Sequence, residues 1–396
     1  MRDTLFHQSP LWLGISGLLI ILLAFRTVWL RVSNSKTRSS ISVPAPRKEL
    51  QSEFSVDSYD QIDPLEEFDL DNEEPLKIRP FKDKYYLTMG IENIAANDLI
   101  VMDKTYLARI NLRKHLINTH TSDVLAYNPI ITPAVTEYYT YLLTIYLPRR
   151  FPTIYTLHPT TLFNTTTNTH IPLTPPSTAA ALRILGENID TDFLFLLPTP
   201  LPPSSGKEGS KYTLQGFITC FPSGFATLSK LNLSLADIHA PVPGYAEKLE
   251  RSMDKFFAAL PAGRIVRRCN WGVTTDDRLF AMSGNHMSED ELRDRRTHNG
   301  KEEEEEEEEV FDVKDCVLRI ERQTLHRLPR TGAVVFAFKT YQYPLGDIVD
   351  EGNGEALAKA IEGLGEGNVP GMKVYKREVV WGERVKRFLR GEAGGE

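Results

Sequence analysis

An apolar run close to the N-terminus constrains this chain more than any other feature. It extends from Leu11 to Leu30, LWLGISGLLIILLAFRTVWL, and only Arg26 interrupts it. Roughly 20 residues are what a helix needs to cross the hydrocarbon core of a bilayer. A cleaved signal peptide is the alternative, but no small-residue cleavage site follows the run, and Trp29 is suited to anchor at a membrane interface. We therefore expect a short tail, residues 1–10, and a single transmembrane helix over residues 11–31.

Basic residues after this run predict its orientation. Between the run and Lys48 the chain carries no acid, and its basic residues are Arg31, Lys36, Arg38, Arg47 and Lys48. Cytoplasmic flanks of membrane spans are enriched in lysine and arginine. We expect the C-terminal part to face the cytosol, from the endoplasmic reticulum or another endomembrane. Three widely spaced cysteines, Cys220, Cys269 and Cys316, fit neither a disulfide framework nor a metal knuckle, which agrees with a reducing compartment.

Segments of biased composition predict the domain limits. Residues 32–75 are rich in serine, proline and acids without a hydrophobic period, which is typical of a disordered tether. A single globular domain is expected over 76–396, with structure beginning near Ile78. Within it, residues 284–310 include eight consecutive glutamates and predict an extended acidic insertion at the surface. Acidic tracts account for the net charge of −7, so no nucleic-acid partner is expected.

Short apolar runs and one helical repeat indicate the fold class. Residues 192–197 and 332–341 are apolar, β-branched or aromatic, and both predict strands. Leu249, Met253 and Phe257 recur at helical spacing, which predicts a helix with one apolar face. This mixture of strand and helix signals predicts an α+β fold, and no internal repeat is found.

Most catalytic signatures are missing from the sequence. It contains no phosphate-binding loop of the G-x-x-x-x-G-K-[ST] type, no G-x-S-x-G and no H-E-x-x-H. The glycines of residues 363–367 follow a helical pattern, whereas a dinucleotide loop follows a strand. Candidate functional residues must therefore be sought in clusters that match none of these common motifs.

The first cluster is DIHAPVPG, residues 237–244, in which two prolines stiffen the chain just after His239. A rigid segment holds an imidazole in one orientation, as a ligand of a metal or of haem iron requires. A histidine that caps or packs against the loop is the alternative, and the residues alone leave both open.

The second cluster is RIERQTLHRLPRTG, residues 319–332, which leads into an apolar strand. Its arginines are Arg319, Arg322, Arg327 and Arg330. Glu321 can pair with only one or two of them, and unpaired charges beside a buried strand are costly. The surplus indicates an anionic ligand with propionate, phosphate or carboxylate groups. A structural salt-bridge network at a sheet edge is the alternative.

Several short motifs occur in a fixed order along the chain. They are MGI at 89–91, LIVMD at 99–103, Tyr106, CFPSG at 220–224, Ile238-His239 with PVP at 241–243, Arg268 with Asn270-Trp271, and the 319–332 block. Over residues 78–345 the chain resembles the family of uncharacterised proteins related to the alpha subunit of haem-dependent oxidative N-demethylase, in a fungal, membrane-anchored form. The block ERQTLxRLPRTGAVVF is long enough to be specific.

The resemblance implies a PAS-like haem domain with a mixed antiparallel sheet and flanking helices. The N-terminal transmembrane helix expected above precedes this domain and is an addition to the family pattern. It implies that haem iron activates dioxygen and that a small secondary or tertiary amine loses a methyl group as formaldehyde. Electrons would come from a separate NADPH, flavin and iron–sulfur reductase, because this chain has no four-cysteine cluster spacing and no nucleotide loop.

The resemblance also implies site residues. His239 is expected as the axial ligand, since His326 occupies a variable position of its motif. Arg322, Arg327 and Arg330 are candidates for the haem propionates, and no catalytic residue is assigned. Asn270 and Trp271 could line the pocket, although core packing is preferred for Trp271.

Departures from the family pattern leave the substrate open. GEN at 186–188 stands where an acidic pair is expected, so a dimethylamine-like substrate is not assumed. Two other functions remain possible on the same fold. One is a haem- or small-ligand-binding sensor, and the other is a non-catalytic, membrane-tethered interaction module.

Overall fold

A computed structural model describes residues 59–200, 210–298 and 310–392 of the chain. The predicted transmembrane helix, the first part of the predicted tether and the run of glutamates lie outside these residues. None of the helices within the described ranges combines the length and the apolar character needed to cross a bilayer.

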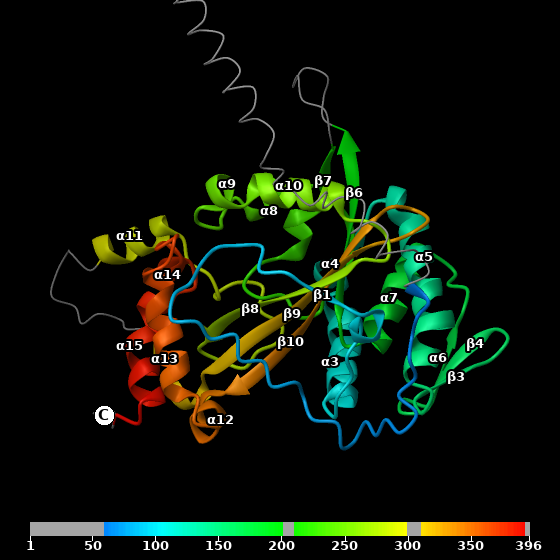
Figure 1. Ribbon diagram of the computed structural model, residues 1–396, viewed down its shortest axis with the longest axis horizontal. Helices are drawn as coiled ribbons and strands as arrows, with labels where there is room; N and C mark the ends of the chain where they lie inside the picture. The colour runs from blue at the N-terminus through cyan, green and yellow to red at the C-terminus, as the bar shows by residue number, and fades with distance from the viewer. Residues whose placement is uncertain (1–58, 201–209, 299–309, 393–396) are drawn as a thin grey trace, which may run out of the picture. The chain divides into compact units, whose positions relative to one another are not determined.

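A seven-stranded sheet forms the centre of the domain, and every neighbouring pair of its strands is antiparallel. Its strands, in spatial order, are β1 (Glu92–Ile94), β8 (Ile265–Thr274), β9 (Val317–Arg327), β10 (Val334–Pro344), β6 (Asp192–Pro200), β7 (Ser210–Ile218) and β2 (Leu125–Tyr127). The predicted strands at 192–197 and 332–341 are confirmed as β6 and β10. Figure 1 shows β8, β9 and β10 side by side in this sheet.

A second, three-stranded antiparallel sheet is formed by β3 (Tyr155–Leu157), β4 (Thr161–Asn164) and β5 (Thr169–Pro172). Together with the helices that flank the large sheet, it confirms a mixed α+β architecture.

Successive residues of a strand point to opposite faces of the sheet, so β9 divides the predicted arginine block between two environments. Glu321, Gln323 and Leu325 lie on the face that is covered by the helices around residues 235–259. Arg322 and His326 lie on the other face, where His326 contacts the ring of Tyr138. A ligand on one face is therefore separated from the side chains of the other by the sheet itself.

The largest core cluster lies on the face of the sheet that carries His326. Its helices are α3 (Tyr106–Thr119), α5 (Thr132–Tyr141), a π-helical turn (Leu142–Tyr146), α6 (Leu147–Arg150) and α7 (Thr178–Asn188). Helix α7 begins at Ser177, whose hydroxyl accepts a hydrogen bond from the backbone N–H of Ala180. The buried face of α7 includes Leu182 and Leu185 and packs into this core.

A buried ion pair between Arg113 and Asp192 joins α3 to β6. Arg113 Nη1 donates to Asp192 Oδ1 over 2.7 Å, and both side chains are almost fully buried. The same carboxylate accepts the backbone N–H groups of Cys220 at 2.8 Å and Phe221 at 2.9 Å. Asp192 thus fixes the loop that follows β7.

The predicted tether of residues 32–75 extends too far toward the C-terminus. Tyr59 and Leu70 are 3% and 7% exposed and belong to the largest core cluster. The ring of Tyr59 contacts that of Tyr141, with 4.9 Å between centroids. The apolar residues of this stretch are irregularly spaced, so they give no periodic signal, yet they pack against the domain.

The predicted acidic insertion is also not extended throughout. Its first half contains helix α11 (Glu289–His298), and Met287 just before it is buried. Three acids in the first turn of α11, Glu289, Asp290 and Glu291, stabilise the helix N-terminus electrostatically.

The C-terminal helices cover one end of the sheet and pack around Trp381 and Trp271. They are α12 (Leu345–Asp350), α13 (Gly354–Glu362), α14 (Met372–Tyr375) and α15 (Glu378–Leu389). Leu357, Ala358 and Ile361 on the buried face of α13 pack into this cluster.

The face of the sheet that carries Glu321, opposite the one that carries His326, is covered by three helices. They are α8 (Leu235–His239), α9 (Tyr245–Lys248) and α10 (Glu250–Ala259), which lie together in Figure 1. The predicted amphipathic helix is confirmed as α10, whose Met253 and Phe257 are buried. These side chains do not fill all the space above the sheet, and the candidate site occupies what is left.

Candidate functional site

A cavity of about 490 Å³ lies between the sheet and helices α8 to α10 and α14. This volume is within the range of roughly 300–1,000 Å³ that is typical of small-molecule and cofactor sites. Its floor is apolar and comes from five neighbouring strands, through Leu194, Leu196, Leu214, Val266, Leu325, Phe336 and Phe338. A few polar and charged side chains interrupt this lining, and they determine what the cavity can bind.

His239 lines the cavity from the last turn of α8. A capping box between Ser234 and Asp237 fixes the start of this short helix. His239 Nδ1 lies 2.7 Å from the carbonyl oxygen of Leu235. A carbonyl only accepts, so Nδ1 carries the proton and Nε2 keeps its lone pair. Nε2 has no hydrogen-bond partner among the described residues.

The surroundings of His239 keep its ring neutral and fixed. Burial lowers its pKa to about 4. Its ring stacks on that of Tyr245, with 4.8 Å between centroids and 13° between planes. The turn between them needs a glycine, because Gly244 has φ of +69° and a Cβ there would lie 2.8 Å from Val369 Cγ2. The sequence prediction of a rigidly held imidazole is in keeping with this geometry.

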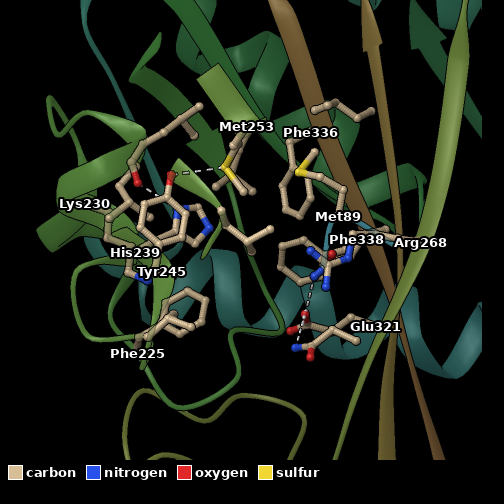
Figure 2. Close-up of a pocket in the computed structure, with 18 of the residues that line it drawn as sticks. Met89, Phe225, Lys230, His239, Tyr245, Met253, Arg268, Glu321, Phe336 and Phe338 are labelled. Atoms are coloured by element: carbon tan, nitrogen blue, oxygen red, sulfur yellow. Dashed lines mark hydrogen bonds between the residues drawn. The ribbon is translucent and has the colours of Figure 1, made fainter. Parts of the chain in front are cut away.

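Arg268 and Glu321 lie across the cavity from His239, on the sheet (Figure 2). Glu321 is 7% exposed and accepts hydrogen bonds from Gln323 Nε2 at 2.8 Å and, more weakly, from Asn270 Nδ2 at 3.5 Å. Arg268 Nε is buried without a partner, and within the described part of the chain its guanidinium forms no hydrogen bond and no ion pair. The two charges thus share one wall of the cavity without pairing.

Two lysines add positive charge to the same cavity. Lys376 is buried, and its Nζ donates to Asn270 Oδ1 at 3.1 Å and to the carbonyl of Trp271. Lys230 Nζ lies 3.5 Å from the ring centroid of Phe225. Burial lowers the pKa of each lysine to about 8.

His286 is a second imidazole in the lining. It stacks on Tyr375 with 4.5 Å between centroids, and burial lowers its pKa to about 4. Its Nδ1 is buried without a hydrogen-bond partner. The cavity therefore offers two neutral imidazoles, of which only His239 has its Nδ1 held by a carbonyl.

The predicted propionate arginines do not line this cavity. Arg322 is buried on the other face of the sheet and donates to the carbonyl of Asp98, beside a separate surface cleft. Arg330 lies on the turn after β9 with its side chain 74% exposed, 3.8 Å from Glu137. Neither guanidinium is placed to reach a ligand that His239 binds.

Arg327 lies on the cavity side of β9, but its guanidinium is fully engaged elsewhere. It donates to the carbonyls of Leu260, Phe257 and Gly332 and to the Tyr212 hydroxyl. Arg319 likewise donates to four carbonyls, those of Phe221, Pro222, Arg278 and Leu279. Backbone carbonyl oxygens thus accept hydrogen bonds from Arg319 and Arg327. The number of arginines in this block therefore requires neither an anionic ligand nor a salt-bridge network.

The remaining predicted residues divide between the two faces. Asn270 lines the cavity, whereas Trp271 is buried in the C-terminal core, as preferred from the sequence. His326 is fully buried beside Tyr59 and Tyr138, and burial lowers its pKa to about 3. His326 is therefore excluded from the cavity.

Sequence reasoning missed Lys230, Lys376 and His286. They lie in three separate segments without a motif, and only the tertiary fold brings them together. The sequence could have placed Arg268 and Asn270 together, because residues two positions apart on a strand point to the same face of the sheet. The register of β8 on β9 sets Arg268 opposite Gln323 and Asn270 opposite Glu321.

No group of three or more histidine, cysteine or carboxylate side chains is arranged to hold a metal ion in the ranges that the structure describes. All three cysteines are free thiols. The model of one protein family, "Haem-dependent oxidative N-demethylase, alpha subunit-like", matches residues 90–386. This match spans well over half of the chain and confirms the resemblance seen in the motifs. The chain therefore belongs to the haem-dependent oxidative N-demethylase alpha subunit-like family.

Proposed function

We propose that this protein is a haem-dependent oxidoreductase of the oxidative N-demethylase type and that His239 ligates the haem iron. The observation that carries the proposal is the state of His239, whose Nδ1–H is held by the Leu235 carbonyl while Nε2 is free in an apolar cavity. Iron-ligating histidines commonly donate their second ring N–H to a carbonyl or carboxylate, which fixes the ring and raises its basicity. The family to which the chain belongs is haem-dependent by its description.

The cavity lining fits a haem in two further respects. Its floor of leucine, valine and phenylalanine side chains suits an apolar macrocycle. The ammonium of Lys230, which forms no ion pair with another described residue, can meet a propionate in place of the predicted Arg322, Arg327 and Arg330. His239, neutral above pH 5 or so, needs no deprotonation before it binds iron.

When bound, haem would supply dioxygen activation. An N-methyl amine would lose its methyl group as formaldehyde, with one oxygen atom entering formaldehyde and the other leaving as water. That balance needs two electrons, which we assign to a separate NADPH, flavin and iron–sulfur reductase. The residues of this chain bind and orient the ligands, and the sheet floor excludes water from them.

The proposal includes the finer points of the fold and the location of the protein. We assign the central antiparallel sheet and its covering helices to a PAS-like haem domain. We also infer that residues 11–31 anchor the chain in a membrane with this domain facing the cytosol. Protease protection of the domain in sealed microsomes would contradict that orientation, and digestion would support it.

The experiment measures haem content and turnover of the full-length chain, expressed with a haem precursor and purified in mild detergent. We expect about one haem per chain. Adding NADPH, a flavin and iron–sulfur reductase and an N-methyl amine should release formaldehyde in proportion to the oxygen consumed. Protein without haem would overturn the proposal. Protein that binds haem but never consumes oxygen with any N-methyl amine would instead indicate a sensor.

A further inference from the structure

Two opposite charges stand unpaired on the same wall of the cavity. Arg268 from β8 and Glu321 from β9 both face it, yet they form no ion pair with each other. Figure 2 shows both on the sheet side, near Phe338 and away from His239 and Tyr245. Glu321 is satisfied by amide N–H groups only, from Gln323 and Asn270.

Neither group forms an ion pair at contact distance with another residue that the structure describes, although Lys230 and Lys376 interact with the charge of Glu321 from farther away. A guanidinium without hydrogen bonds is costly beside apolar side chains, and a carboxylate is its best partner because the two can form paired hydrogen bonds. Glu321 has unused lone pairs and no cation in contact, so an ammonium group fits there. A ligand that carries both charges would satisfy both residues at once.

We propose that Arg268 and Glu321 bind a small zwitterion of the amino-acid class, with its carboxylate on Arg268 and its ammonium on Glu321. The apolar part of the ligand packs against Phe336 and Phe338. This inference rests on the proposed function where it names a substrate, which is then an N-methylated amino acid. A simple dialkylamine fits less well, since it leaves Arg268 unpaired and is repelled by Lys230 and Lys376.

A carboxylate on Arg268 has two possible sources, the small ligand or a haem propionate. Arg268 lies across the cavity from His239 (Figure 2), and this position favours the small ligand, because a haem held by His239 would come between the two side chains. Lys230 is left for the propionate. The test below separates the two sources.

The experiment measures binding by titration calorimetry to the full-length chain, with the haem absorbance of the same sample recorded first. The probes are N,N-dimethylglycine and two matched analogues of nearly equal shape. Isovalerate carries only the carboxylate, and N,N-dimethylisobutylamine carries only the ammonium. We expect N,N-dimethylglycine to bind roughly 10–100-fold more tightly than either analogue, as a charged hydrogen-bonded pair predicts.

Substitutions assign each charge to one residue. Arg268→Gln should lower the affinity for N,N-dimethylglycine to that for the amine, and Glu321→Gln should lower it to that for isovalerate. Arg268→Lys keeps the charge and should restore part of the loss. Arg293→Gln is the matched control, because Arg293 is 70% exposed on α11. Circular dichroism confirms that each variant is folded.

Two results would overturn the inference. The first is N,N-dimethylglycine binding no more tightly than its two analogues. The second is an Arg268→Gln variant that loses haem but keeps the wild-type affinity for N,N-dimethylglycine, which would assign Arg268 to a propionate. Absence of haem absorbance in the wild type would contradict the proposed function instead, and the affinities would still decide the zwitterion site.

Discussion

Removal of the Asp192 carboxylate tests the buried ion pair that joins α3 to β6. Arg113 and Asp192 are 0% and 1% exposed, with 2.7 Å between Nη1 and Oδ1. Removing one partner of such a pair costs about 3–5 kcal/mol, and each amide left without an acceptor adds at least about 1 kcal/mol. Asp192 also accepts the N–H groups of Cys220 and Phe221. We expect Asp192→Ala to lower the free energy of unfolding by about 5 kcal/mol.

The assay is urea unfolding followed by circular dichroism. Because domains are stable by only about 5–15 kcal/mol, Asp192→Ala should be partly unfolded without urea. Asp192→Asn keeps one acceptor oxygen and should lose about 3 kcal/mol. Asp276→Ala is the control, since its partner Arg278 is 72% exposed and such surface pairs contribute less than about 1 kcal/mol. A loss below about 1 kcal/mol for Asp192→Ala would refute the reasoning.

Two further predictions concern β9. The pKa of His326 is lowered to about 3 by burial, so the unfolded chain takes up a proton near pH 6.5 that the folded chain excludes. The free energy of unfolding should therefore fall as the pH decreases from 7 to 4. His326→Phe should make this dependence less steep in urea titrations, while His239 and His286, whose pKa values burial also lowers to about 4, maintain the rest of it; an unchanged slope would contradict the prediction. Arg322→Gln and Arg330→Gln should both leave haem content unchanged, because neither side chain reaches the cavity, whereas equal loss of haem in both would contradict the assignment.

The elements with strong periodic signals were predictable from the sequence. The spacing of Leu249, Met253 and Phe257 gave helix α10, and the β-branched and aromatic run at 332–341 gave strand β10. These signals depend on local patterns, which a sequence displays directly. The prolines after His239 predicted a rigid segment, but they did not predict the cavity that its ring lines.

The parts that depend on tertiary partners were not predictable. The sequence showed four arginines between residues 319 and 330 but not the carbonyls that receive them. Carbonyl acceptors exist in every residue and leave no trace in the composition. Arg319 and Arg327 therefore looked unpaired in the sequence, although both donate to backbone carbonyls in the structure. Tyr59 and Leu70 pack through irregular spacing, which composition assigned to a tether.

The charged lining of the cavity shows the same limit. Lys230 and Lys376 line the same cavity only because the segment after β7 and the segment after α14 both lie over the sheet. The placement of Arg268 opposite Gln323 and of Asn270 opposite Glu321 follows from the register of β8 on β9, which the sequence does not state. The chemistry of the site therefore became visible only with the fold.

The visible absorption spectrum of the His239→Ala variant tests the central claim most directly. The full-length chain is expressed with a haem precursor, beside wild type and a His158→Ala control, since His158 is exposed in the three-stranded sheet region. We predict a Soret band in wild type and in His158→Ala, and a shifted or lost band in His239→Ala. A band of unchanged position and intensity in His239→Ala would show that His239 does not ligate the iron.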